Sequence, residues 1–413
     1  MSTHLEDRLA SVLTDAAEAA PVPGYDPVEA VRGRQRRRRN RHAVVAAACA
    51  VAVAAAGSVA TVRLAVPTVD HRVGSVASPD RIPDFANLAS PEKVWPRAVH
   101  RLPATLPDGS AYTVAQVLGD GRYLVLTGED TVAPSVYDQR AGTVTALATA
   151  APFDGLARPG TRMARAIGDR AVWFVSGFRN NKGVSEAWTA PLRGGTPVRL
   201  VSMAEGVGPR FMVAGNGIAW EKQLSDPSAP GGISSVIRTV SLDGGGVRDV
   251  PGTKGFTLAQ VEPWVTSQRI ATGLYPKTSG EMLNVVTGER RRWSANDKVQ
   301  FLRCGPTWCS GDGSGGVVLQ NLDGTGYTEL GYGGSLEQRM GGRLAVGTLG
   351  LPDWRGGMIW DRTTGRAARY TTPKPAGRIT VVNAVINSDS EPPVQIWLPD
   401  DKTMMVLDLT AIR

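Results

Sequence analysis

Six stretches of this chain share one pattern: an apolar strand, a turn that contains glycine, and a second strand. Tight hairpin turns need positive φ at one or two positions, which glycine adopts without steric cost. With one glycine marking each copy, the copies follow one another at intervals of 53, 50, 43, 38 and 39 residues. The copies are VYDQRAGTVTAL (136–147), TAPLRGGTPVRL (189–200), TVSLDGGGVRDV (239–250), LNVVTGERRRW (283–293), LQNLDGTGYTEL (319–330) and IWDRTTGRAARY (359–370), and MVLDLTAIR at the end of the sequence resembles a truncated seventh.

A second pattern, a turn leading into a buried strand, precedes each copy of the first. Its copies are LGDGRYLVLTG (118–128), IGDRAVWFVSG (167–177), AGNGIAWE (214–221), TSQRIATG (266–273), RCGPTWCSG (303–311) and MGGRLAVG (340–347), the fourth without glycine in its turn. Two interleaved patterns with one period indicate a single supersecondary unit used six or seven times. About four short strands per unit at this period are typical of a β-propeller.

We therefore expect residues 92–413 to form an all-β propeller of about seven four-stranded blades, with six blades as the alternative. The last copy ends after MMVLDL, short of an outer strand, whereas RAVHRLPATL (97–106) stands just before the first copy. We predict that 97–106 supplies the missing strand and closes the ring, because closure removes an open sheet edge.

Upstream of the repeats, residues 35–62 join a basic run to an apolar one. Residues 43–62 hold twenty residues without a charge, which is about the length needed to cross a hydrocarbon core of roughly 30 Å. The excess of arginines before this run places the N-terminus in the cytosol. The arginines that set this topology include Arg36, Arg37, Arg38, Arg39 and Arg41.

A cleaved signal peptide is the alternative to a membrane anchor, but its charged region would be about 41 residues long, well beyond the usual layout. We therefore predict a single-pass protein of the cell membrane with its N-terminus cytoplasmic and its C-terminal domain extracytoplasmic. Residues 1–41 form the cytosolic segment, 43–62 the transmembrane helix, and 63–91, rich in Pro, Ser and Asp, an extracytoplasmic linker.

The cytosolic segment begins with a helix pattern. Thr3 and Glu6 have the spacing of a capping box, and apolar residues follow at helical intervals from Leu5 to Ala16. Two interpretations stay open: a short helix that lies on the bilayer, or a docking surface at residues 3–20 for a cytosolic protein.

The formal net charge of +8 does not indicate nucleic-acid binding. Its dense part is the short arginine run beside the apolar segment, and none of the aromatic residues lies in that run. Nucleic-acid readers instead spread basic residues over a folded face. The partners we expect are the plasma membrane, through one span, and an envelope ligand or protein at the propeller.

Composition limits the chemistry of the repeat region. The four histidines are His4, His42, His71 and His100, so a Ser-His-Asp or Cys-His site after residue 100 is excluded. No G-x-S-x-G elbow and no calcium-loop motif occurs. We expect no catalytic residues, no cofactor, no bound metal and no enzyme.

A carboxylate-dependent glycosidase is an alternative because two acids suffice for that chemistry. The candidate acids are Asp120, Asp169, Asp243 and Asp323. Each stands in a glycine-rich turn, where an aspartate commonly hydrogen-bonds its own backbone, and we predict this turn role for them.

Two further residue types carry predictions. Cys304 and Cys309 flank a Gly-Pro turn, and we predict a disulfide in an oxidising exterior. Free thiols stay an alternative, whereas zinc would need two more soft ligands that the region lacks.

Tryptophans in predicted strands should pack between blades, whereas Trp264, Trp293 and Trp354 fall near turns and are candidates for a ligand-facing rim.

With these blade motifs and its apolar segment, the chain resembles TolB-like and WD-repeat-like propellers, in particular the single-span extracytoplasmic propeller proteins common in actinobacteria. The Gly-His and Trp-Asp pairs of WD repeats are missing apart from Trp360–Asp361. The resemblance implies a membrane-anchored binding module of the cell envelope. The alternative is a transmembrane signalling protein whose N-terminal segment docks a cytosolic regulator such as a sigma factor.

Overall fold

The computed structural model describes residues 82–128, 132–148, 155–204, 211–226, 233–267, 279–350, 356–371 and 393–413. The predicted cytosolic segment, the predicted transmembrane helix, the topology-setting arginines and most of the predicted linker lie outside these ranges. Among the residues that the structure does describe, no helix combines the length and the apolar character that a membrane span requires.

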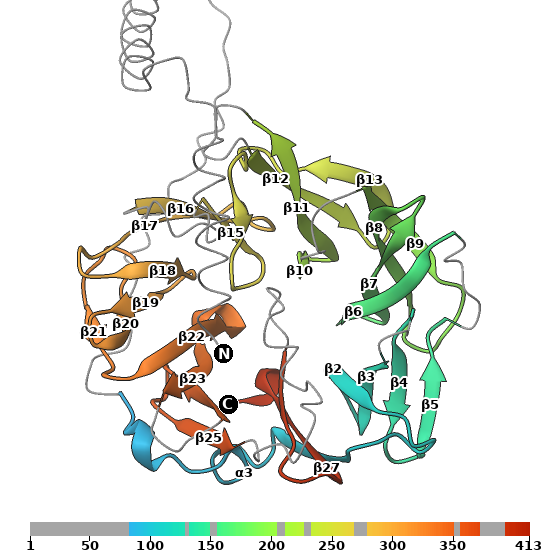
Figure 1. The fold of residues 1–413 in the computed structure, drawn as a ribbon, viewed down its shortest axis with the longest axis horizontal. Helices are drawn as coiled ribbons and strands as arrows, with labels where there is room; N and C mark the ends of the chain where they lie inside the picture. Colours follow the sequence, from blue (N-terminus) through green and yellow to red (C-terminus); the bar gives the residue numbers. More distant parts are fainter. Residues whose placement is uncertain are drawn as a thin grey trace, which may run out of the picture. The chain divides into compact units, whose positions relative to one another are not determined.

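Residues 99–408 form seven antiparallel sheets in the part of the chain that the structure describes, arranged as the blades of a ring (Figure 1). We number the blades along the chain. Blade 1 holds β2 (Tyr112–Gly119), β3 (Arg122–Thr127), β4 (Ser135–Asp138) and β5 (Thr143–Ala146); blade 2 holds β6 (Ala157–Ile167), β7 (Arg170–Arg179), β8 (Lys182–Pro191) and β9 (Val198–Ala204); blade 3 holds β10 (Phe211–Val213), β11 (Gly217–Ser225), β12 (Ile233–Ser241) and β13 (Gly244–Asp249).

Blade 4 holds β14 (Thr257–Leu258), β15 (Trp264–Thr266), β16 (Ser279–Asn284) and β17 (Arg290–Ser294); blade 5 holds β18 (Gln300–Cys304), β19 (Cys309–Gly313), β20 (Gly316–Gln320) and β21 (Thr328–Glu329); blade 6 holds β22 (Gly333–Arg339), β23 (Leu344–Gly350), β24 (Gly356–Asp361) and β25 (Ala367–Thr371); blade 7 holds β26 (Val394–Trp397), β27 (Thr403–Asp408) and β1 (Val99–Pro103). Short helices are η2 (Phe85–Asn87), α3 (Pro91–Val94), η4 (Met340–Gly342) and η6 (Leu409–Ala411). The expected propeller is confirmed, and the number of blades is seven rather than six.

Blade 7 closes the ring with strands from both ends of the repeat region. Its strand order is β1-β27-β26, with Val99 opposite Leu407 and Pro103 opposite Thr403. The strand predicted within 97–106 therefore pairs with the last copy, as expected. This blade has three strands among the described residues, whereas the other six have four.

The turns between third and fourth strands show why the glycine pattern recurs. In blades 1, 4 and 6 the third strand ends at Asp138, Asn284 and Asp361, whose Oδ1 atoms accept hydrogen bonds from the backbone two and three residues later. A glycine with φ of 66° or 75° stands four positions after each of them. An Asx turn and a left-handed glycine thus define one repeated hairpin.

One repeat assignment was wrong. The fourth copy of the second pattern was placed at 266–273, but Thr266 already ends β15 and residues 268–278 lie outside the described ranges. The turn between the first two strands of blade 4 is 259–263, which ends in Glu262 and Pro263. Proline rather than glycine marks this turn, so a pattern built on glycine missed it.

Large side chains fill the spaces between neighbouring blades. Trp173 of β7 packs against Leu124 and Val136 of blade 1, and its Nε1 donates to the Val132 carbonyl at 3.0 Å. Trp264 and Trp293 are 5% and 2% exposed and belong to a core cluster, so they do not line a rim as suggested above. Trp354 lies outside the described residues.

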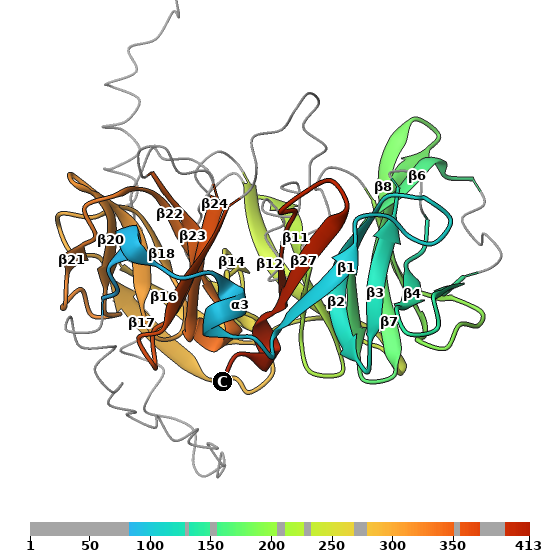
Figure 2. The ribbon, with the colours of Figure 1, turned by 90° about the horizontal axis from the view of Figure 1, so that it is seen from below.

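The chain before β1 runs along the outer edges of blades 5 and 6, where Figure 2 shows it crossing the front of the ring. Phe85 contacts the rings of Tyr332 and Trp360 edge-on. The backbone N–H of Arg369 on β25 donates to the Ala89 carbonyl at 2.9 Å. Residues at the end of the predicted linker are therefore packed on the propeller.

Candidate functional site

The first strand of each four-stranded blade lies nearest the middle of the ring, as Figure 1 shows for β2, β6, β10, β18 and β22. The end of β22 lies beside the C-terminus, because Arg343 Nη1 donates to the Ile412 carbonyl at 3.1 Å. The inner strands begin at one face of the ring, which we call the start side, and end at the opposite face, which we call the end side.

At the end side, charged and amide side chains gather around the axis. Arg165 of β6 is 5% exposed, and Gln338 and Arg339 of β22 are 0% and 6% exposed. Glu262 stands in the turn between β14 and β15 and is partly buried. We call these four residues the axial cluster.

The axial cluster connects blades that are not neighbours. Glu262 Oε1 accepts a hydrogen bond from the Val213 N–H of blade 3 at 3.0 Å. Burial raises the pKa of Glu262, against the opposing charges of Arg165 in blade 2 and Arg339 in blade 6. The turn of blade 4 therefore interacts with three other blades through one carboxylate.

The arginine of blade 6 has a second acidic partner. Arg339 Nη2 donates to Glu337 Oε2 at 2.5 Å, which ties its guanidinium to its own strand. The Gln338 N–H also lies 3.5 Å from Gln260 Oε1 in the blade 4 turn. Two acids and two arginines therefore lie together at this end of the axis among the described residues.

At the start side the inner strands of blades 5 and 6 are exposed instead. Gln300 and Phe301 begin β18, and residues 333–335 begin β22. Phe301 is 56% exposed and has φ of 48°. A bulky residue in the left-handed region is an outlier that costs on the order of 1–3 kcal/mol and marks functional sites more often than other places.

A β-bulge holds Phe301 in this conformation. Gln300 pairs with Asp312 and Arg303 with Ser310, so Phe301 and Leu302 together face Gly311. A Cβ on Gly311 would lie 2.7 Å from the Gln300 carbonyl oxygen and 2.6 Å from the Val299 side chain. Gly311 therefore provides the space that the bulge needs, and bulges often aim a side chain at a site.

The other end of β18 is joined to β19 by a disulfide between Cys304 and Cys309, whose Cα atoms are 4.0 Å apart. Both residues are buried in the cluster between blades 4 and 5. The strand that carries Phe301 is thus held at its far end by a covalent link.

The four turn aspartates are not brought together. Asp243 Oδ2 accepts from Asn216 Nδ2 at 2.6 Å, and Asp120 adopts φ of 54° in its own turn. The Asp169 carbonyl accepts from the Leu192 N–H. Hydrogen bonds from the Thr325 hydroxyl and N–H lower the pKa of Asp323, which is the opposite of what a general acid needs. Their observed roles are structural.

Within the described ranges, no three His, Cys, Asp or Glu side chains converge in a way that would hold a metal ion. The residues of interest at the axis, Arg165, Glu262, Arg339 and Phe301, were not singled out from the sequence. The one local signal is in the blade 4 turn, where Glu262 and Pro263 stand and the corresponding turns of the other four-stranded blades have glycine.

Comparison with known proteins gives likeness in structure only. No family model matches the sequence, and no curated protein matches it. A puromycin hydrolase has a TM-score of 0.41 and 14% identity over 68% of this chain and 49% of its own, and a Mycobacterium tuberculosis puromycin-hydrolyzing peptidase has 0.39 and 14% over 67% and 49%. An oligogalacturonate lyase in complex with manganese has 0.34 and 10% over 80% of this chain and 90% of its own.

This chain thus spans about half the length of the two hydrolases. The expectation that the chain is not an enzyme is corrected: the solved structures that it resembles are hydrolases and a lyase, so the propeller fold gives that expectation no support. The expected resemblance to TolB-like or actinobacterial single-span proteins is supported only as far as the propeller fold. Similarity at this level shows the fold and transfers no activity.

Proposed function

We propose that the propeller binds an envelope component or partner protein at the start side of the ring, over the inner strands of blades 5 and 6. The observation that carries the proposal is Phe301, a large aromatic side chain 56% exposed on an innermost strand. Its backbone is held in an unfavourable region by the bulge opposite Gly311. Solvent exposure alone gives no compensation for that strain, whereas contact with a ligand does.

The surroundings of Phe301 fit a binding surface. Aromatic residues anchor interfaces most often when polar groups surround them. Gln300 lies beside Phe301, and Ser335 is exposed at the start of β22 in the next blade. The proposal concerns binding alone, so it holds for a protein that retains its ligand and for one that converts it.

Phe178 provides a matched control for this site. It is 50% exposed at the end of β7 in blade 2 and is not among the residues with positive φ. The test is photo-crosslinking in intact cells followed by mass spectrometry, with Phe301→Ala and Phe178→Ala beside the wild type. We expect Phe301→Ala to lower recovery of the crosslinked ligand at least fivefold and Phe178→Ala to leave it unchanged. Equal recovery from all three proteins would place binding elsewhere.

We further propose that residues 43–62 anchor the chain in the membrane with the propeller outside, which rests on the charge and hydropathy of the sequence. A disulfide between Cys304 and Cys309 suits an oxidising exterior. In spheroplasts, added protease should degrade the propeller and leave a membrane-bound N-terminal fragment. Protection of the propeller until the cells are lysed would place it in the cytosol and refute the topology.

The same crosslinking experiment addresses the signalling alternative. A chain lacking residues 1–30 keeps the arginine run and the apolar segment. A cytosolic regulator recovered with the full chain and lost with the shortened one would favour signalling. Identical recovery from both would make the N-terminal segment an anchor only.

A further inference from the structure

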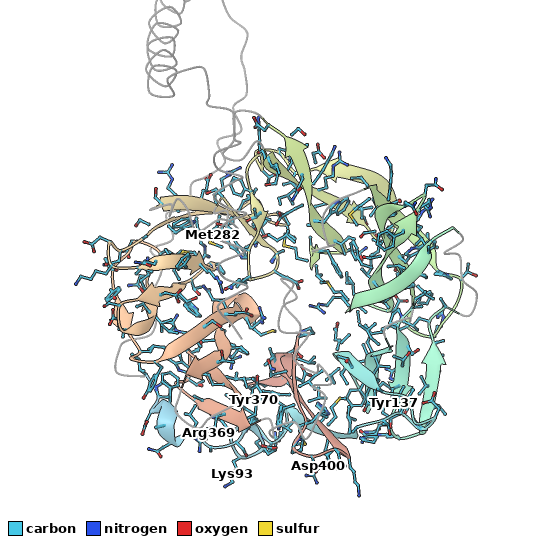
Figure 3. The ribbon with its side chains drawn as sticks, in the orientation of Figure 1. Lys93, Tyr137, Met282, Arg369, Tyr370 and Asp400 are labelled. Carbon is cyan, nitrogen blue, oxygen red and sulfur yellow. A yellow bond between two sulfur atoms is a disulfide. The ribbon has the colours of Figure 1, made fainter. Side chains whose placement is uncertain are left out.

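A separate cavity of about 290 Å³ lies at the outer edge of the ring, where α3 meets blades 6 and 7. Its lining includes Pro91, Glu92, Arg369, Tyr370, Trp397 and Pro399. Figure 3 shows Arg369 and Tyr370 side by side at this edge, with Lys93 and Asp400 beside them. The lining comes from three places in the chain that the ring closure brings together.

Two stacked aromatic rings form one wall of the cavity. The ring centroids of Tyr370 and Trp397 are 5.2 Å apart at an interplanar angle of 28°. The two residues are 8% and 3% exposed, and the Tyr370 hydroxyl lies against Gly357, where a Cβ would be 1.9 Å away. Pro91 and Pro399 also line the cavity, so four of its lining residues offer apolar surface.

The cavity also presents one charge of each sign. Glu92 Oε2 is buried and accepts no hydrogen bond from the described residues. The other oxygen of this carboxylate, Oε1, is not among the buried unpaired atoms, and it is the one that a donor in the cavity meets. An unpaired buried carboxylate oxygen is unfavourable, and a charged donor such as an ammonium group is its best partner.

Arg369 provides the opposite charge. Its Nη1 donates to the Ala86 carbonyl at 3.0 Å, which holds the side chain in place. A guanidinium has five N–H donors, so one bond leaves donors for a carboxylate. An anion alone would meet Glu92 and a cation alone would meet Arg369, whereas a ligand with both charges pairs with both.

We propose that this cavity binds a free amino acid with an apolar or aromatic side chain. The ammonium group donates to Glu92, the carboxylate accepts from Arg369, and the side chain lies on the Tyr370–Trp397 wall. This site is at the outer edge of the ring and does not depend on binding at Phe301. Ligand binding would add a further link between α3 and blades 6 and 7.

The test is isothermal titration calorimetry of the purified full chain with three probes. L-Phenylalanine carries both charges, phenethylamine lacks the carboxylate, and 3-phenylpropanoate lacks the ammonium group. We expect L-phenylalanine to bind and each analogue to bind at least tenfold more weakly. No heat from millimolar L-phenylalanine, or equal affinity for an analogue, would overturn the proposal.

Single substitutions test whether L-phenylalanine binds in this cavity. Glu92→Gln should weaken L-phenylalanine binding about tenfold, whereas Lys93→Gln, at a neighbouring position that does not line the cavity, should leave it unchanged. Phe301→Ala should bind L-phenylalanine like the wild type, so failure at one site is distinguishable from failure at the other. Unchanged affinity in Glu92→Gln would show that the amino acid binds elsewhere and refute the assignment.

Discussion

The two ends of the inner strands differ in almost every physical respect. At the end side, the axial cluster buries ionisable groups from blades 2, 4 and 6 against one another. At the start side, β18 holds an uncharged aromatic ring out to solvent in a strained backbone. The contrast separates two tasks, because one end connects blades across the ring and the other is left free for contact.

Buried charges are weak evidence for stability, since their desolvation offsets much of their attraction. Buried charges have a clearer effect on which arrangement of the blades is the stable one. Apolar contacts between adjacent blades are non-directional, whereas a carboxylate facing two guanidinium groups favours one arrangement of blades 2, 4 and 6. We infer that the axial cluster sets the geometry on which the exposed start side depends.

The largest effect is expected for Glu262→Ala. This change removes the carboxylate that faces the buried Arg165 and Arg339, although Arg339 keeps its bond to Glu337. Removing one partner of a fully buried pair costs about 3–5 kcal/mol, and partial solvent access to Glu262 lowers the expectation to about 2–3 kcal/mol. Urea unfolding measures the loss as a lower midpoint with an unchanged slope.

Asp243→Ala is the control for this measurement, because Asp243 is an exposed turn residue bonded to Asn216. Such surface changes usually stay within about 0.5 kcal/mol. Equal midpoints for the two variants would mean that the axial cluster contributes nothing to the free energy of unfolding.

The next effect concerns the bulge at the start side. In Gly311→Ala the new Cβ would clash with the Gln300 carbonyl, so the bulge must open. We expect a loss of about 1–3 kcal/mol, as for other overpacked sites, together with loss of the crosslinked ligand. Gly183→Ala, at a position with open space and ordinary φ, should do neither. If Gly311→Ala still captured the crosslinked ligand, the bulge would not be required for binding.

The repeat pattern predicted most of the fold, because the hairpins depend on local chemistry. Asp138 and Asp361 cap their turns with the same backbone bonds, so the same letters recur at the same spacing. Ring closure was also predictable, since an incomplete last copy and a spare strand before the first copy are both visible in the sequence.

The sites were not predictable in the same way. Glu262 becomes an axial residue only because its turn faces β6 and β22, which lie about 100 and 75 residues away in sequence. Phe301 occupies an ordinary apolar position in QFLRC, and only the pairing with Gly311 reveals the bulge. The outer cavity depends on Glu92, Arg369 and Trp397, whose proximity follows from ring closure.

The pH dependence of stability should differ between Glu262 and Asp361. Burial raises the pKa of Glu262 in the folded protein, so its folded state holds the proton to higher pH. Its contribution to stability therefore falls as pH rises from the unfolded value, about 4.3, through the folded pKa. Relative to the wild type, Glu262→Gln should gain stability over that range.

The stability contribution of Asp361 should change with pH in the opposite direction. Burial acts to raise its pKa, but hydrogen bonds from Arg343 and the turn lower it overall. Its contribution is present above the unfolded pKa and is lost as pH falls through the folded value. Asp361→Asn should therefore lose less stability in acid than at neutral pH. Parallel pH profiles for the two variants, from urea unfolding between about pH 2 and pH 8, would contradict these assignments.

The smallest effect, and the sharpest test of the comparison, is a gain in stability from Phe301→Asn. Asparagine tolerates the left-handed region far better than phenylalanine, and the exposed ring contributes little burial. We expect a gain of about 0.5–1 kcal/mol, seen as a higher urea midpoint, together with loss of the crosslinked ligand. Phe178→Asn replaces an aromatic in regular strand conformation and should lose stability, because strands favour aromatic residues. If both variants lost stability equally, Phe301 would be a packing residue, and the start side would no longer differ from the end side in its role.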